Sequence, residues 1–202
     1  MNTIMSENKP QPIGRMLLKD VRIAFAQGIF EASVVGTDPT AKPRFGASFL
    51  VPPDHPQLKE IEAKIKAVAE EKWKAKAGPM LAAIQKKDRT CLHDGDDKPQ
   101  YDGYAGNMYV TANAQESTPP TVLNQDRTMF EAKKGHKRIY SGARVNANIE
   151  IWAQDNAFGQ RVNATLRGVQ FYRDADSFSA ASAAAGSEFE EVTDGNDAED
   201  FT

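Results

Sequence analysis

His93, Asp94, Asp96 and Asp97 are the residues whose types and spacing come closest to those of a catalytic or metal-binding site. The run from Asp94 to Asp97 resembles the start of a calcium-binding loop, in which carboxylates at alternate positions coordinate the ion. The later glycine and the distal glutamate of such a loop are missing at the required spacing. A polar turn before a strand explains the run equally well, and we expect that role, with no metal site and no cofactor. The alternative is a metal-dependent nuclease that uses Asp94, Asp96 and Asp97.

A larger set of aromatic, cationic and amide side chains could do different chemistry. Aromatic rings stack on nucleobases while Lys and Arg neutralise phosphates, and together they bind single-stranded nucleic acid. The candidate DNA-binding residues are Arg44, Tyr104, Tyr109, Lys133, Lys134, Lys137, Arg138, Tyr140, Arg144, Asn146, Asn148, Trp152, Arg161 and Arg167. The alternative is that Trp152 packs under a loop and the arginines are solvated surface. No phosphate-binding loop, G-x-S-x-G motif or zinc-type pairing of Cys and His occurs, so nothing requires catalysis.

The stretch from residue 139 to 172 must position the centre of that set. Between residues 143 and 153 small and branched apolar residues alternate with polar ones, which predicts a strand with one buried face. Residues 154–160 contain turn-forming residues, and the apolar alternation resumes at Val162. The parity slips by one residue after Gly168, which predicts a β-bulge. We expect a hairpin whose outer face carries Asn146, Asn148 and Trp152.

The rest of the chain contains further strands and one clear helix. Alternation predicts strands at 16–25, 29–35, 45–51 and 108–114, whereas 58–73 has an apolar stripe of helical period. Gly78-Pro79 is expected to end that helix, with a short second helix over 80–87. The order predicts a mainly β protein, a single OB-fold-like barrel of five to six strands. One α-helix is expected between strands three and four, with long loops and a disordered acidic C-terminal tail.

Composition and charge divide the chain into a folded body and flanking segments. We expect a flexible leader at 1–13, the folded domain at 14–174, a flexible linker at 175–187 and an acidic tail at 188–202. Residues 179–202 contain seven carboxylates and no Lys or Arg, which leaves 21 acidic and 25 basic residues in 1–178, a charge of about +4. A basic body with an acidic tail is typical of a nucleic-acid binder that carries its own competing polyanion.

Two features of the sequence indicate its cellular compartment. No run of about 18 apolar residues exists, so we expect no membrane partner. The single cysteine, Cys91, excludes an internal disulfide and fits a reducing compartment. We therefore expect a cytoplasmic protein.

Several segments along 90–202 resemble those of a known family. They are DGDDKP at 94–99, GYAGNMYVTANA at 103–114, IYSGARVNANIEIWA at 139–153, GVQFYRD at 168–174 and DAEDFT at 197–202. On these segments the chain resembles the phage replication single-stranded DNA-binding proteins of the gene 2.5 protein type. The resemblance implies an OB-fold that coats single-stranded DNA during phage replication or recombination in the host cytoplasm, without enzymatic activity.

The resemblance also implies partners for the tail. It predicts that Asp197, Glu199, Asp200 and Phe201 contact replication proteins, a polymerase or a helicase/primase, and that the tail lowers DNA affinity. Phe201 is penultimate here, whereas the tails of the family usually finish in an aromatic residue. Homodimers occur often in the family and are a further implied state. Besides the nuclease, the alternative is an interaction protein that does not bind DNA.

Overall fold

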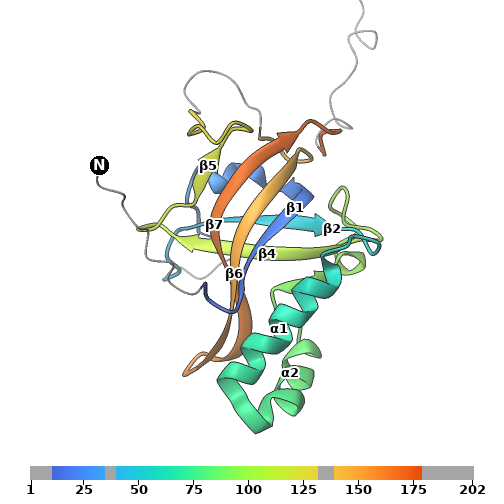
Figure 1. Cartoon of the computed structure of the whole chain (residues 1–202), viewed down its shortest axis with the longest axis vertical. Helices are drawn as coiled ribbons and strands as arrows, with labels where there is room; N and C mark the ends of the chain where they lie inside the picture. The colour runs from blue at the N-terminus through green and yellow to red at the C-terminus, as the bar shows by residue number, and fades with distance from the viewer. Residues whose placement is uncertain (1–10, 35–39, 132–138, 179–202) are drawn as a thin grey trace, which may run out of the picture.

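The structure, a computed structural model, describes residues 11–34, 40–131 and 139–178, and these form one strongly curved sheet beside two helices (Figure 1). The strands run in the order β3-β4-β2-β1-β6-β7-β5. The elements are β1 (Arg15–Ala24), a 3-10 helix (Ala26–Ile29), β2 (Arg44–Val51), α1 (Leu58–Trp73), a 3-10 helix (Lys74–Lys76), α2 (Ala77–Gln85), β3 (Leu92–Asp94), a 3-10 helix (Gly95–Asp97), β4 (Met108–Gln115), β5 (Thr121–Leu123), β6 (Arg144–Asn156) and β7 (Gly159–Arg173).

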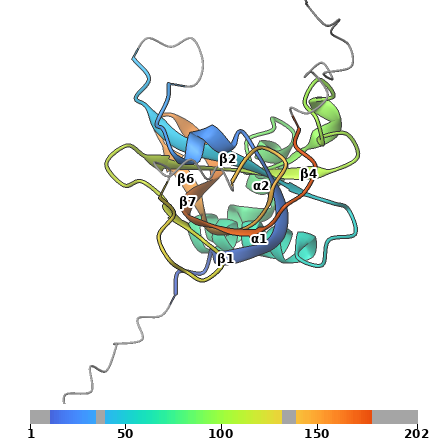
Figure 2. The ribbon, with the colours of Figure 1, turned by 90° about the horizontal axis from the view of Figure 1, so that it is seen from above.

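The sheet closes into a barrel because β4 also meets β7. β1 pairs antiparallel with both β2 and β6, and β4 pairs in parallel with β7 at Asn113 and Thr165. The ring β1-β2-β4-β7-β6 is therefore a five-stranded barrel, with β3 and β5 added at its edges. Figure 2 shows this ring from above, with α1 and α2 beneath it. The predicted mainly β, OB-fold-like architecture is confirmed.

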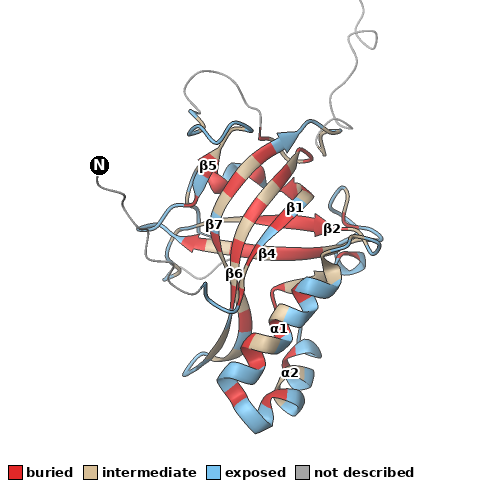
Figure 3. Cartoon of the chain, viewed as in Figure 1, coloured by how far each residue is buried: buried red, intermediate tan, exposed pale blue. Residues whose placement is uncertain are grey.

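The barrel interior is filled by the apolar residues whose alternation the sequence shows. Leu18, Phe49, Val110, Ile149 and Leu166 come from the five barrel strands, and each is at most 1% exposed. In Figure 3 buried and partly exposed positions alternate along β6 and β7, as the pleat of a half-buried strand requires. The helical stripe is confirmed as well, since α1 buries its apolar face in the same core.

The expected strand at 29–35 is wrong. Phe25 has a φ of 58°, which ends β1 and turns the chain into a 3-10 helix whose Ile29 is buried in the main core. Among the described residues of the expected strand, 29–34, only Ser33 pairs with a strand, through an isolated bridge to Arg44. The helix therefore follows the second strand of the barrel, not the third.

The predicted break at Gly78-Pro79 is also wrong, because α1 ends at Trp73 and these two residues lie in the first turn of α2, where proline is tolerated.

The hairpin β6–β7 is the longest element of the sheet and is anchored at both ends. The predicted bulge is confirmed: Asn148 pairs with Gly168 and Ile149 with Leu166, so Arg167 is the extra residue. At the far end the indole Nε1 of Trp73 donates a hydrogen bond of 2.9 Å to Asp155 Oδ2, which ties the hairpin to α1. The chain after β7 stays packed on the barrel as far as Phe178.

Candidate nucleic-acid interface

The outward side chains of β6 and β7, together with those of the neighbouring β1, form a polar surface that we call the hairpin face. Cross-strand pairing places Asn146 opposite Gln170 and Trp152 opposite Asn163. Arg15 and Leu17 of β1 lie beside Glu150 and Asn148. The hairpin face therefore adds residues of β1 that the sequence did not single out to six predicted DNA-binding residues. The six are Arg144, Asn146, Asn148, Trp152, Arg161 and Arg167.

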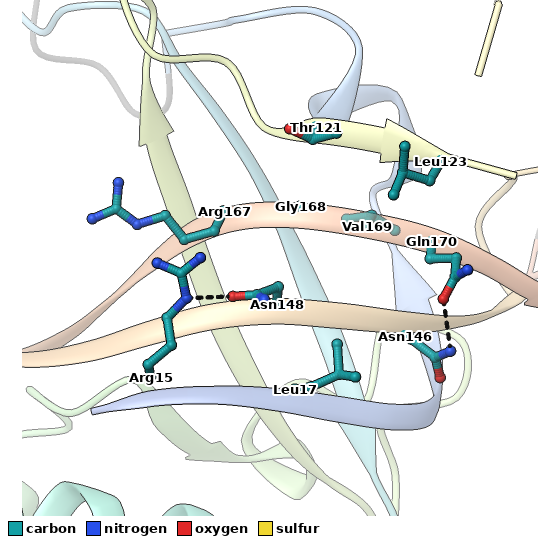
Figure 4. Close-up of a pocket in the computed structure, with 10 residues that line it drawn as sticks. All are labelled: Arg15, Leu17, Thr121, Leu123, Asn146, Asn148, Arg167, Gly168, Val169 and Gln170. Atoms are coloured by element: carbon teal, nitrogen blue, oxygen red, sulfur yellow. Dashed lines mark hydrogen bonds between the residues drawn. The ribbon is translucent and has the colours of Figure 1, made fainter. Parts of the chain in front are cut away.

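A shallow groove of about 260 Å³ runs along this face between β1 and β5 (Figure 4). Its walls carry Arg15, Leu17, Thr121, Leu123, Asn146, Asn148, Arg167, Gly168, Val169 and Gln170. A Cβ at Gly168 would lie 3.0 Å from the Thr121 carbonyl oxygen, so glycine at this position allows β5 to lie close to β7. The groove offers guanidinium and amide donors beside short apolar patches, a lining suited to a sugar-phosphate strand.

Two arginines of the groove share one carboxylate. Glu150 Oε2 accepts hydrogen bonds from Arg167 at 2.8 and 3.0 Å and lies 3.5 Å from Arg15 Nη1. Arg15 Nε also donates to Asn148 Oδ1 at 2.8 Å, as Figure 4 shows. These contacts orient both guanidinium groups, and the trio keeps a net charge of +1.

At the other end of the hairpin face, Asp20 likewise pairs with two arginines. It lies at a bulge between β1 and β6, and its carboxylate accepts from Arg144 at 3.2 Å and from Arg173 at 2.9 Å. Burial raises the pKa of this carboxyl, but the two guanidinium groups outweigh that effect and the pKa is lowered overall. Arg144 therefore lies where the sequence predicts, with part of its charge already compensated.

Trp152 carries the exposed indole of the hairpin face. Its Nε1 donates a hydrogen bond of 3.0 Å to Thr165 Oγ1 on β7, which fixes the ring on its own sheet. The residue nevertheless remains 41% exposed. Trp152 thus does not pack under a loop, and its ring is available for stacking.

The end of the hairpin carries an aromatic residue that the sequence analysis missed. Phe158 is 86% exposed, and Arg161 on β7 is exposed near it. The residues Asp155, Asn156 and Gly159 favour turns, so the sequence predicts only a turn at 154–160. The signal that could have identified Phe158 is its large apolar side chain within that polar run.

Two predicted tyrosines lie elsewhere, in a small second core on the outside of β2 and β4. Tyr104 and Tyr109 are only 2% and 7% exposed, and their ring centroids are 4.8 Å apart. Burial raises the pKa of the Tyr109 hydroxyl to about 12. The rings of Tyr104 and Tyr109 therefore pack in this core and do not face solvent. Phe25 and Tyr101 contact the Tyr104 ring and are 50% and 42% exposed.

The remaining predicted residues are dispersed. Arg44 begins β2 and is exposed at an edge of the barrel. The Tyr140 hydroxyl is bonded to the chain after β7, where it donates to the Ala175 carbonyl oxygen at 2.7 Å. The other predictions lie outside the described residues: Lys133, Lys134, Lys137 and Arg138 of the basic cluster, and Asp197, Glu199, Asp200 and Phe201 of the tail.

The acidic run forms a turn that is held by hydrogen bonds from backbone N–H groups. Asp94 accepts from the Asp96 N–H at 3.0 Å, and Asp96 accepts from the Gly106 N–H at 2.7 Å. His93 is bonded to Asp88 at 2.6 Å and stacks on Tyr109.

Within the part of the chain that the structure describes, no three His, Cys, Asp or Glu side chains are grouped to hold a metal. In the same part of the chain, no helix is long and apolar enough to cross a membrane.

Comparison with known proteins decides the family. Residues 14–202 match the sequence model of the family described as the ssDNA-binding protein of Enterobacter phage Enc34. The chain belongs to this family. The predicted resemblance to phage single-stranded DNA-binding proteins is thereby confirmed.

Individual proteins similar to this chain cover 80–89% of it. Protein p50 of Acyrthosiphon pisum secondary endosymbiont phage 1 is 39% identical over 182 residues, covering 89% of this chain and 94% of that one. The single-stranded DNA-binding protein of bacteriophage Enc34, solved in complex with ssDNA, is 27% identical with a TM-score of 0.65 and covers 82% of this chain and 89% of that one. A more distant match is gp2.5 of bacteriophage T7, at 12% identity and a TM-score of 0.48 over 80% of this chain and 87% of that one.

Proposed function

We propose that this protein binds single-stranded DNA independently of sequence and acts in phage DNA replication or recombination. The observation that carries the proposal is membership of the Enc34 family over residues 14–202, supported by the 27% identical relative that was solved with ssDNA. The shared barrel supplies the scaffold, since OB-folds bind oligonucleotides on their outer surfaces.

The hairpin face is the proposed site of DNA contact. It combines an exposed indole, a row of amides and guanidinium groups held 2.8 to 3.5 Å from carboxylate partners. In this arrangement Trp152 stacks on a base, while Arg15 and Arg167 contact phosphates from the groove. Stacking is tolerant of sequence because every base has a π-face, and phosphate contacts carry no sequence information.

The protein acts by binding alone in this proposal, not as a nuclease. The carboxylates of Asp94 and Asp96 accept backbone hydrogen bonds and thereby fix a turn. Their positions are explained by that structural role, so no metal-assisted cleavage is required to account for them.

We propose that the acidic tail regulates DNA binding and recruits a replication partner. Seven carboxylates follow residue 178 while the body carries a charge of about +4, so the tail can compete with DNA for basic surface. We propose that Asp197, Glu199, Asp200 and Phe201 contact the replication partner, a polymerase or a helicase/primase. The protein would work in the host cytoplasm, with a homodimer as one of its states.

Binding measured against salt tests the function directly. We expect tight binding to a single-stranded oligonucleotide, weaker binding to the same sequence as a duplex, and a negative slope of log affinity against log salt. The slope should be about −0.7 for each phosphate contacted on a single strand. Absence of affinity for single strands at low salt would favour the interaction protein, and magnesium-dependent loss of labelled DNA would favour the nuclease.

A further inference from the structure

Phe158 is more exposed than any other large apolar residue of the described chain, at 86%, yet the backbone that presents it is firmly held. Its N–H donates to Asn156 Oδ1 at 2.9 Å, and Gln154 Nε2 donates to the same oxygen at 3.1 Å. Gln154 in turn accepts from Asn163 Nδ2 at 3.0 Å. A line of amide contacts therefore runs from Asn163, the residue opposite Trp152, to the end of the hairpin.

Single exposed apolar side chains are common on protein surfaces, so exposure alone has little meaning. The surroundings of Phe158 set it apart. Gln154 and Arg161 form a cross-strand pair between Trp152 and the tip, so Arg161 belongs to the hairpin face. Unlike Arg144 and Arg167, Arg161 forms no ion pair with another described residue.

The one nearby carboxylate of the hairpin lies on the opposite side. Asp155 accepts from Trp73 Nε1 at 2.9 Å and from Gln160 Nε2 at 3.0 Å, both of which belong to the side that packs towards α1. Adjacent residues of a strand point to opposite faces, so Asp155 is turned away from the side of Gln154 and Arg161. The charge of Arg161 is therefore available to a ligand on the hairpin face.

We infer that Phe158 is a second base-stacking residue and that the single-stranded DNA path continues from Trp152, past Arg161, to the hairpin tip. This inference rests on the proposed function and extends its site. Two aromatic rings with a cation between them provide the alternation of stacking and phosphate contact that single strands need. The four residue steps from Trp152 to Asn156 extend the path by about 14 Å at ~3.4 Å per residue.

The test uses the full chain and oligothymidylates of about 4 to about 16 nucleotides, the range that OB-folds cover. Binding is measured at fixed low salt for wild type and for the variants Phe158→Ala, Phe158→Leu and Phe158→Tyr. On long oligonucleotides we expect Phe158→Ala and Phe158→Leu to lose fivefold or more in affinity. On the shortest oligonucleotide that wild type binds, all variants should agree within about twofold, and Phe158→Tyr should match wild type throughout because it keeps the ring.

Other results would overturn the inference. If Phe158→Ala binds like wild type at every length, the tip does not contact DNA. A different pattern would show that the tip is an apolar contact between copies of the chain. In that case Phe158→Leu would bind like wild type, and Phe158→Ala would lose affinity only on strands long enough to hold two protein molecules. Failure of the proposed function itself looks different, because wild type would then bind no oligonucleotide of any length.

Discussion

Glu150 controls the charge of the groove at the scale of single residues. Its carboxylate lies between Arg15 and Arg167, so it both positions the two guanidinium groups and removes half of their charge. A phosphate that enters the groove must compete with this carboxylate. The affinity of the groove for DNA should therefore depend on Glu150 in the opposite sense from an ordinary contact residue.

Glu150→Gln should tighten single-strand binding severalfold at low salt. The glutamine oxygen can still accept from the arginines, while the net charge of the groove rises by one. The slope of log affinity against log salt should become steeper by up to about 0.7 if one more phosphate is engaged. Glu62→Gln, the same charge change on the exposed side of α1, is the control and should have little effect. Weaker binding by Glu150→Gln would show that the two arginines do not contact phosphate.

The sequence alone identifies the outward residues of the hairpin but not the residues that form ion pairs with them. Strict alternation from 143 to 153 suffices to place Asn146, Asn148 and Trp152 on one face, because the side-chain period of a strand is two. The pairing of Arg15 with Glu150 joins residues 135 positions apart and depends on the register between β1 and β6. No local pattern contains that register, so the compensation of the arginine charges could not be predicted.

At the scale of elements, the segment after β7 acts as a strap across the barrel. The Phe178 N–H donates to the Ser141 carbonyl oxygen at 3.0 Å, and the Arg22 guanidinium lies 4.2 Å above the Phe178 ring. The ring packs on the small core of Tyr104 and Leu50. A Cβ at Gly103 would lie 2.5 Å from that ring, so the strap requires glycine there.

Phe178→Ala should lower the free energy of unfolding by about 1–3 kcal/mol, less than the 3–5 kcal/mol of a fully buried phenylalanine because this ring is only partly buried. The measurement is urea denaturation. Phe158→Ala is the matched control: the same substitution at a ring that is 86% exposed should change stability by less than about 0.5 kcal/mol. Equal stability of the two variants would mean that the strap does not hold the fold.

The elements themselves were predictable to different degrees. The helix that begins at residue 58 follows from a local apolar stripe, but its end at Trp73, before Gly78-Pro79, does not follow from that pattern. The strand expected at 29–35 failed because the left-handed turn at Phe25 diverts the chain and Ile29 fills the barrel core instead of pairing. Alternation of apolar residues cannot distinguish a strand from a loop that buries side chains at the same spacing.

At the scale of the whole molecule, the separation of charge is the main feature. A body of about +4 is followed by a tail with seven carboxylates on the same chain. In the proposed function, a linker of this length would hold the tail at about millimolar effective concentration near the body, and a weak contact with basic surface would be partly occupied at low salt. DNA would then have to displace the tail before it binds.

Removal of residues 187–202 should tighten single-strand binding severalfold at low salt, and the gain should shrink as salt screens the tail. Titrations of full-length and shortened protein at several salt concentrations measure this. Phe201→Ala is the control for charge: it should leave DNA affinity nearly unchanged but weaken binding to the replication partner. If the shortened protein binds DNA no more tightly at any salt concentration, the tail does not compete.

The two tryptophans of the chain allow the hairpin face to be tested as the DNA-binding site. Trp152 is 41% exposed on the hairpin face, whereas Trp73 is 8% exposed and bonded to Asp155. Titration with oligothymidylate should quench tryptophan fluorescence in wild type and in Trp73→Phe. In Trp152→Phe the quenching should largely disappear, and Trp152→Ala should bind about fivefold or more weakly while remaining folded. Undiminished quenching in Trp152→Phe together with wild-type affinity of Trp152→Ala would contradict the assignment of single-stranded DNA to the hairpin face.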